Sequence, residues 1–431
     1  MKKLGLIIVA GLLLLSLTNV FAGTQPSEQK IKIKMYAYQD LSDATTSANW
    51  DKLLNAFKTA NPDIELEIEY GFNEPYHTKL QAMTQAGQIP DVVFLWPDKR
   101  TGEVTGSGMI KDLRPYLKGK ENEFAPFAMT AQGPNGEIYE LPEQVTATHV
   151  MYTNDKLLKD LGLTFPKTMA ELIAQGDAIR AKGLIPIAMD NKDAWEMQSC
   201  FASALVERMC GKDWFKKAIV GKAKFTDPEF VAAMQVIKDL ADAQMFSPGI
   251  NQAAYGTALT DFVNEKAVYF IDGGWRVNNL VTELSADQKE YVSLHVFPAI
   301  PGEKNPGSTS AVAGTGYGMN AKLSGDKEKA AWRWVWFYSG PEGSKIRATF
   351  GALPAYKIDL GNADIMLKKL NAFLGATPAG YVIDSVMDSE GMGVFNPLLQ
   401  ELIMGNKTAA DVGKEYETWV AANDSGRKKK M

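Results

Sequence analysis

The chain has 431 residues, of which 51 are acidic and 46 are basic, so its formal net charge is −5. This acidic balance disfavours a nucleic-acid surface, which needs clustered cations to replace phosphate counterions. The length suits two domains of roughly 100 to 200 residues each, and no apolar stretch beyond the first 22 residues is long enough to span a membrane.

The N-terminus has the pattern of a secretory signal peptide. Met1-Lys2-Lys3 precedes an apolar run over residues 4–17, and a small-residue cleavage sequence ends at Ala22. The run is shorter than the roughly 20 residues that cross a bilayer, which favours cleavage over anchoring. No cysteine follows the cleavage site, so we expect no lipid attachment and a soluble protein of the periplasm.

The segment after the signal predicts a strand and then a helix. Apolar and polar residues alternate over Ile31–Tyr36, and the strand would end beside Tyr38 and Asp40. Apolar side chains then recur at positions 50, 53, 54 and 57, the spacing of one helix face. This helix should stop before Pro62, because proline cannot continue the hydrogen-bond ladder.

The next part of the chain adds two strands around a helix. Residues 64–70 alternate between apolar side chains and glutamates, which predicts a strand near a sheet edge. After a helix over residues 76–86, the apolar run of residues 91–96 suits a strand covered on both faces. It would carry Trp96 and Asp98 to its carboxyl end, where open α/β sheets bind ligands.

A second series of helices and strands begins near residue 149. It is predicted to contain a helix over 169–182, a strand over 185–189 and a helix over 230–244. Later, a strand of the buried type leads into Asp272-Gly273-Gly274-Trp275. Its glycines permit a tight turn that can project Trp275 into a cleft between lobes.

Three further features are interpreted as structural. The aromatic residues of 331–338 fall at helical spacing and predict core packing. Gly314–Gly318 lacks the lysine ending of a phosphate-binding loop and predicts a turn. Cys200 and Cys210 lie ten residues apart in one predicted helix, about 15 Å, beyond the disulfide limit of about 7 Å. We therefore expect two buried thiols.

Short sequence blocks follow one another over nearly the whole chain after the signal. They are Asn61-Pro62-Asp63-Ile64, Tyr76 to Leu80, Gly87 to Val93, Gly136 to Pro142, Met151 to Asn154, Phe262 to Trp275, and Gly351 to Ala355. In this order the blocks resemble family 1 extracellular solute-binding proteins, the sugar-capturing components of bacterial ABC importers that include the maltose-binding type. The resemblance implies an α/β fold of the type II periplasmic binding protein kind, with two doubly wound lobes joined by a multi-segment hinge.

The resemblance also implies where the lobes lie. The N-terminal lobe would take residues 23–145 and 310–352, the C-terminal lobe residues 146–305 and 356–424, and the chain would cross near 144–148, 303–312 and 351–356. Short parallel crossings of this kind can bend together and let two rigid lobes close on a ligand. The remaining residues, 425–431, form a basic tail that is interpreted as solvated.

A sugar pocket needs aromatic faces for the ring and charged or amide groups for the hydroxyls. The resemblance places Asp98 on the family's sugar-hydroxyl carboxylate, with Trp96 one residue away from the usual aromatic. Trp275 matches the family's tryptophan that stacks on sugar. Tyr38 and Asp40 match another ligand-contacting segment, although a solvated loop also explains them.

The other candidates are weighed against structural roles. Trp195 falls where the second lobe of the family supplies a stacking aromatic, and Asp193 is either a ligand or an acidic helix N-cap. Glu143 lies at the first crossing, as a hinge or a ligand residue. Arg276 is either a donor to hydroxyls or a salt-bridge partner of a neighbouring carboxylate.

The leading hypothesis is a monomeric, non-enzymatic receptor that captures a sugar or oligosaccharide and delivers it to a membrane permease. A secreted glycoside hydrolase is the rival, because carboxylates beside aromatics also serve glycosidic cleavage. The same fold could instead select a polyamine or a sugar phosphate. We expect no cofactor and no metal, since His77, His149 and His295 show no metal spacing and are interpreted as structural or exposed.

Overall fold

The computed structural model describes residues 30–125, 128–129, 133–312 and 314–423. The predicted signal peptide and the basic tail lie outside these residues. Within them, no helix combines the length and the apolar character that a membrane crossing needs.

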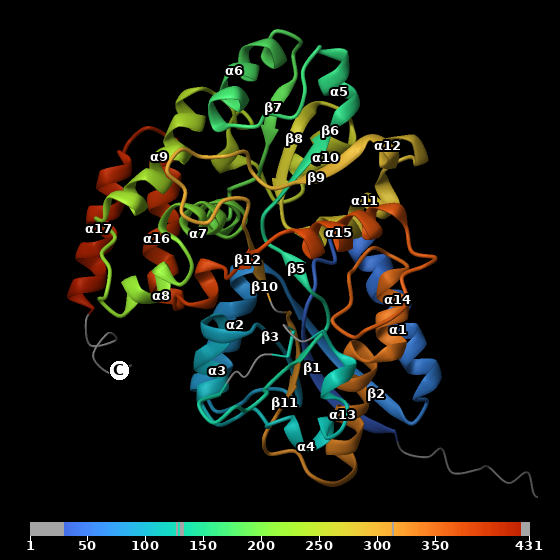
Figure 1. Ribbon diagram of the computed structural model, residues 1–431. Coiled ribbons are helices and arrows are strands. Elements are labelled where there is room, and N and C mark those ends of the chain that lie inside the picture. Colours follow the sequence, from blue (N-terminus) through green and yellow to red (C-terminus); the bar gives the residue numbers. More distant parts are fainter. Residues whose placement is uncertain (1–29, 126–127, 130–132, 313, 424–431) are drawn as a thin grey trace, which may run out of the picture.

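The first lobe is built on a five-stranded sheet with the order β2-β1-β3-β11-β4, in the lower half of Figure 1. Its strands are β1 (Ile31–Tyr38), β2 (Ile64–Gly71), β3 (Val92–Leu95), β4 (Leu141–Pro142) and β11 (Gly316–Met319). β1 is parallel to β2 and β3, whereas β11 is antiparallel to β3 and β4. The alternating strand β2 thus lies at the edge and the fully apolar β3 in the interior, as predicted.

Helix α1 (Ala44–Ala60) shows how the sequence sets a local boundary. It buries the predicted apolar stripe at positions 50, 53, 54 and 57. At its start the Asp43 carboxylate accepts a hydrogen bond from the Thr46 backbone N–H at 2.6 Å, which satisfies a free helix donor. At its end the Asn61 amide donates to the Phe57 carbonyl at 2.9 Å, and Pro62 follows.

The first lobe contains several further helices. They are α2 (Asn73–Gln85), η1 (Asp98–Thr101), α3 (Gly102–Gly106), α4 (Arg114–Leu117), η2 (Glu121–Glu123), α13 (Gly325–Ser339) and α14 (Pro341–Ala348). α13 packs against β1 and β11. Its Trp334 is fully buried, 5.0 Å from the Phe57 ring and 5.7 Å from the Trp50 ring. The prediction of core packing for this aromatic stripe is confirmed.

The second lobe is built on a four-stranded sheet with the order β7-β8-β6-β9, in the upper half of Figure 1. Its strands are β6 (Val150–Asn154), β7 (Ile185–Ala188), β8 (Ala267–Asp272) and β9 (Val292–His295). β8 is parallel to β7 and antiparallel to β6. All six residues of β8 are buried, as its apolar sequence predicts.

Helices pack against this second sheet and extend into a C-terminal group. They are α5 (Asp155–Asp160), α6 (Met169–Arg180), η3 (Met197–Ala202), α7 (Ser203–Cys210), α8 (Trp214–Ile219), α9 (Pro228–Asp242), η4 (Ile250–Gln252), α10 (Thr257–Val263), η5 (Gly274–Arg276), α11 (Val277–Glu283), α12 (Ala286–Tyr291), α15 (Ile365–Ala376), η6 (Ile383–Ser385), α16 (Ser389–Ile403) and α17 (Ala409–Ala422). α9 packs against α7, α16 and α17, so the chain's C-terminal helices complete the second lobe.

The chain crosses between the lobes through neighbouring segments. A small sheet has the order β12-β10-β5, with β5 (Thr146–Ala147), β10 (Thr309–Val312) and β12 (Ala379–Gly380). Next to it, Gln144 forms an isolated antiparallel bridge with Pro354. The three predicted crossing regions therefore lie side by side. The fold prediction of two α/β lobes joined by several segments is confirmed.

The structural interpretations of the cysteines and the glycine-rich loop also hold. Cys200 and Cys210 are buried and free, in a helical stretch whose first part, η3, is a π-helix. In the loop, a Cβ atom on Gly316 would lie 1.8 Å from the Leu141 carbonyl oxygen. Only glycine allows β11 to approach β4 this closely, so the glycine has a structural reason and needs no phosphate.

Candidate functional site

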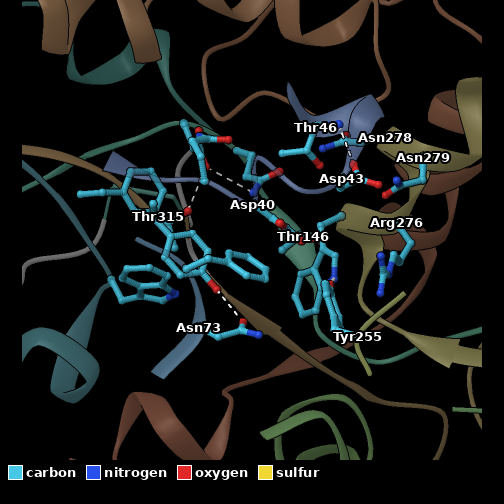
Figure 2. A pocket seen from close by; sticks show the side chains of 18 of the residues that line it. Asp40, Asp43, Thr46, Asn73, Thr146, Tyr255, Arg276, Asn278, Asn279 and Thr315 are labelled. Carbon is cyan, nitrogen blue, oxygen red and sulfur yellow. Dashed lines mark hydrogen bonds between the residues drawn. The ribbon is translucent and has the colours of Figure 1, made fainter. Parts of the chain in front are cut away.

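A cavity of about 380 Å³ lies between the two lobes, within the size range of small-molecule sites. Its walls come from the ends of β1 and β3, from the crossing segment of residues 143–148, and from the loops around the end of β8. Figure 2 shows polar side chains from these parts of the chain, among them Asp40, Thr146 and Arg276, gathered around one space. Both lobes therefore contribute to one site.

Aromatic rings form the first lobe's wall of this cavity. The rings of Tyr38, at the end of β1, and Trp96, just after β3, meet edge to face with centroids 4.7 Å apart. Phe72 lies 4.9 Å from Tyr38, and His77 lies 4.6 Å from Trp96. Burial, with a contribution from nearby Arg100, holds the pKa of His77 well below its usual value, so its ring is neutral. His77 lines the cavity, a position that its sequence surroundings do not predict.

Three aromatic residues form the opposite wall. Trp275 donates its indole N–H to the Tyr255 hydroxyl at 2.8 Å. The Trp195 ring lies 5.3 Å from the Tyr255 ring and 6.1 Å from the Trp275 ring. A Cβ atom on Gly273 would come within 2.4 Å of the Trp275 ring, so glycine is required for the tryptophan to fold back over the turn after β8.

The two aromatic walls approach each other across the lobes. Phe72 of the first lobe and Tyr255 of the second have ring centroids 6.0 Å apart. Flat rings on both sides of a narrow space suit a ligand with apolar faces, because aromatic side chains offer large contact areas with few rotatable bonds.

Two buried arginines line the cavity, each paired with a carboxylate. The Arg276 Nε lies 2.6 Å from Asp272, and its guanidinium lies 3.8 Å from the centre of the Tyr255 ring. Arg347 lies 2.7 Å from Glu143. Burial opposes the charge of Arg276, but Tyr255 and Asp272 outweigh it and its pKa is raised. These pairs neutralise the arginine charges within the walls.

Carboxylates without an ion-pair partner among the described residues give the cavity an acidic character. They are Asp40, Asp43, Glu283 and Asp384, all in its lining. Some buried polar atoms of the lining also lack a hydrogen-bond partner in the described structure: Arg276 Nη2, Trp195 Nε1 and Asn278 Oδ1. A buried polar group without a partner is costly, so a ligand with hydroxyl groups would satisfy these atoms.

The structure brings most of the predicted site residues together. Those that line the cavity are Tyr38, Asp40, Trp96, Glu143, Trp195, Trp275 and Arg276. Asp193 is not in the lining; it accepts a hydrogen bond from Asn73 of the other lobe at 2.8 Å. Asp98 begins η1, but its side chain lies outside the described part of the structure.

Sequence reasoning missed several residues of the lining. Tyr255 stands in the loop between η4 and α10, Arg347 in α14, and Asn73 at the start of α2. Tyr255 and Arg347 follow no predicted strand, and only tertiary contacts bring them to the cavity. Asn73 does follow the predicted strand of residues 64–70, so the position of ligand residues at strand ends could have identified it.

Two buried carboxyl groups support the second lobe's wall. Asp190 accepts hydrogen bonds from the backbone N–H groups of Gly256 and Ala258, at 2.8 and 2.9 Å, and so holds the loop that carries Tyr255. Burial raises the pKa of Asp190 to about 7. Glu196 is 2% exposed with neither oxygen hydrogen-bonded in the described structure, and burial, with Asp193 nearby, raises its pKa to about 9.

The remaining histidines have structural surroundings. The His149 Nε2 accepts the Phe297 backbone N–H at 3.2 Å, while Nδ1 lies 2.7 Å from the Cys200 carbonyl oxygen. His295 stacks on Phe165 at 3.9 Å. Within the described ranges, no three His, Cys, Asp or Glu side chains are grouped so that they could hold a metal ion.

Comparisons with known proteins agree on one family. The family model for bacterial extracellular solute-binding proteins matches residues 42–345. The multiple sugar-binding protein of Streptococcus mutans is 24% identical over 310 residues, 69% of this chain and 70% of that protein. The glucose-binding protein GlcS of Saccharolobus solfataricus is 21% identical over 369 residues, 80% of this chain and 63% of that protein.

A solved structure is similar over nearly the whole chain. It is a chitin oligosaccharide binding protein, which superposes with a TM-score of 0.81 at 21% identity and covers 93% of this chain and 100% of its own. At this level of identity the likeness concerns the fold, which is that of a two-lobed binding protein.

Proposed function

Because the chain belongs to the bacterial extracellular solute-binding protein family, we propose that it captures a sugar or oligosaccharide between its lobes and delivers it to the permease of an ABC importer. The family consists of binding proteins, and the chain acts in our proposal without catalysis. The observation that carries the proposal is a cavity with aromatic walls from both lobes. Closure of two such walls would sandwich the apolar faces of a sugar ring.

We assign the ligand contacts by chemistry. Trp275 and Trp195 would stack on sugar faces from one side, and Tyr38 and Trp96 from the other. Arg276 would donate its free Nη2 hydrogens to ligand oxygens, while Asp40 would accept hydroxyl hydrogens. Hydrogen bonds to ionised groups are roughly twice as strong as neutral ones, which offsets the desolvation of buried hydroxyls.

Glu143 has a different proposed role. Its carboxylate is paired with Arg347 at 2.7 Å and accepts the Thr315 hydroxyl at 3.1 Å. Thr315 lies between β10 of the crossing region and β11 of the first lobe, so Glu143 would join the first lobe to the crossings and shape the cavity floor. We place it in the hinge rather than among the ligand contacts.

The charge arrangement bears on the ligand class. The three arginines of the lining, Arg100, Arg276 and Arg347, are already paired with carboxylates, whereas a phosphate needs several free convergent cations. A neutral saccharide fits this arrangement better than a sugar phosphate.

We also retain the proposed lobe limits, since α15 to α17 pack with the second lobe and α13 and α14 with the first.

The proposed location follows from the family, whose members are extracellular. The signal peptide of residues 1–22, cut after Ala22, would direct the chain to the periplasm. The two lobes, once closed, would present a joint surface to the permease, which must provide the passage through the membrane.

The test is a thermal-shift panel on the purified mature protein. The panel contains maltotriose, raffinose, N,N′-diacetylchitobiose and xylotriose, with glucose 6-phosphate and spermidine as charged competitors. A ligand at 100 times its dissociation constant stabilises the folded state by about 2.7 kcal/mol, so a neutral saccharide should raise the Tm. A rise in Tm with spermidine or glucose 6-phosphate alone would reject the proposal that the ligand is a neutral saccharide. Release of shorter sugars over repeated turnovers would show that the protein is a hydrolase.

A further inference from the structure

One of the side-chain hydrogen bonds between the lobes lies beside the cavity. Asn73, the first residue of α2, donates from its amide nitrogen to the Asp193 carboxylate at 2.8 Å. Asn73 belongs to the first lobe and lines the cavity, whereas Asp193 follows β7 in the second lobe. Because the partners belong to different lobes, this bond must break when the lobes separate.

The same amide also contacts a residue of the aromatic wall. Its oxygen accepts the Tyr38 hydroxyl at 3.2 Å. Only one orientation of the amide serves both partners, since the carboxylate can only accept and the amide nitrogen can only donate. Asp193 thus fixes the orientation of the Asn73 amide, and in that orientation the Tyr38 hydroxyl must donate to the Asn73 oxygen. Figure 2 marks a hydrogen bond of Asn73 with a dashed line.

The backbone on both sides of the bond has a positive φ. Asn73 has φ = 51° and Ala194, next to Asp193, has φ = 65°. The left-handed region is tolerated by asparagine but costly for alanine. Such conformations persist where the surrounding structure holds them, and they gather at ligand clamps and switch regions.

We propose that Asn73 is a positioning residue that couples a ligand on Tyr38 to closure of the lobes through Asp193. The inference rests on the proposed function and adds a role that direct ligand contacts do not supply. A ligand that packs against Tyr38 holds its hydroxyl toward the Asn73 oxygen, and the amide then holds the opposite lobe. Since the Asn73–Asp193 bond exists only when the lobes are together, it favours the closed form and slows ligand release.

The experiment is a double-mutant cycle with Asn73→Gly, Asp193→Ala and the double variant. Glycine suits position 73 because it adopts a positive φ without strain, so the change removes the side chain alone. The probe is whichever of maltotriose, raffinose, N,N′-diacetylchitobiose and xylotriose gives the wild type its largest thermal shift. Tryptophan fluorescence measures the dissociation constant and, by stopped flow, the two rate constants.

Each single variant should weaken binding five- to twentyfold, mainly through faster dissociation, with the association rate constant within twofold of the wild type. The double variant should be no weaker than Asn73→Gly, because both lose the Tyr38 contact and all three variants lose the bond between Asn73 and Asp193. The control is Asn406→Gly, which removes an amide–carboxylate bond of the same length, 2.8 Å, from within the second lobe. It should leave both rate constants unchanged.

Two results would overturn the coupling: unchanged dissociation rates in both single variants, or losses that multiply in the double variant. Failure of the proposed function is recognised separately, since the wild type itself would then bind none of the four saccharides. In that event the radius of gyration in solution still tests the contact, because Asn73→Gly should raise it relative to the wild type while Asn406→Gly should not.

Discussion

The indole N–H of Trp275 donates to the hydroxyl of Tyr255 at 2.8 Å, and this contact fixes the angle at which the tryptophan faces the cavity. Tyr255 also supports Arg276, whose guanidinium lies 3.8 Å from its ring centre. Because the phenol oxygen already accepts from Trp275, its own hydrogen remains available to a ligand oxygen. One tyrosine thus organises a stacking surface and a cationic donor.

Tyr255→Phe removes the hydroxyl and keeps the ring. We expect about a fivefold loss of saccharide affinity, since one hydrogen bond contributes about 1 kcal/mol. The Trp275 emission should also shift, because its N–H loses a partner. Isothermal titration and fluorescence measure the two effects. Tyr291→Phe is the control, because its hydroxyl bonds Glu265 away from the cavity; equal affinities in both variants would contradict the role of Tyr255.

Trp275→Ala should have a larger effect. A tryptophan at the centre of a binding site commonly contributes about 2 kcal/mol or more, about thirtyfold in affinity. Titration with the best saccharide of the panel measures the loss, and circular dichroism checks that the fold is kept. Trp332→Ala removes a ring that packs on Tyr116 outside the cavity and should leave the affinity unchanged. Wild-type affinity in Trp275→Ala would remove this residue from the site.

Glu143→Gln tests the buried ion pair. The change leaves Arg347 charged, buried and without its carboxylate, so the free energy of unfolding should fall by about 3 to 5 kcal/mol. Chemical denaturation measures it. Asp326→Asn breaks an exposed pair with Lys329 and should produce no measurable change. If the free energy of unfolding falls equally in both variants, burial of the Glu143–Arg347 pair does not increase its contribution to stability.

The stability of the protein should fall at alkaline pH through Glu196. Its pKa in the folded protein is raised from 4.5 to about 9, so the folded state binds a proton that the unfolded state has released. This contribution is complete below pH 4.5 and is lost as the pH rises towards 9. Glu196→Gln cannot titrate, so its Tm should match the wild type near about pH 5 and exceed it near about pH 9.5. Parallel Tm curves over that range would exclude Glu196 as the source.

The pattern of single elements was accessible from the sequence. The apolar stripe of α1, the alternating polar face of β2 and the unbroken apolar run of β3 each reflect a local sequence pattern, and each appears where it was expected. The turn before Trp275 was also predictable, because two adjacent glycines after a buried strand favour a tight change of direction. The helix stretch that contains Cys200 and Cys210 was expected, but its π-helical start was not.

The roles of individual polar residues were not accessible in the same way. The sequence allowed Asp193 to be a ligand or a helix cap, and the structure instead pairs it with Asn73 from 120 positions earlier in the chain. His77 lies in the cavity wall, and its spacing in the sequence does not predict that position. Such contacts depend on how the two lobes face each other, and no local spacing encodes that.

Periodicity, turn residues and the series of blocks are local properties of the chain, so they were enough to predict the elements, their order and the family. Which side chains share the cavity depends instead on how distant parts of the chain pack together. Tyr255, Arg347 and Asn73 reach the cavity from a loop and two helices that the crossings bring together. Burial then determined the charge state of the ionisable groups. Arg347 and Glu143 form an ion pair inside the protein, and removal from water raises the pKa of Glu196.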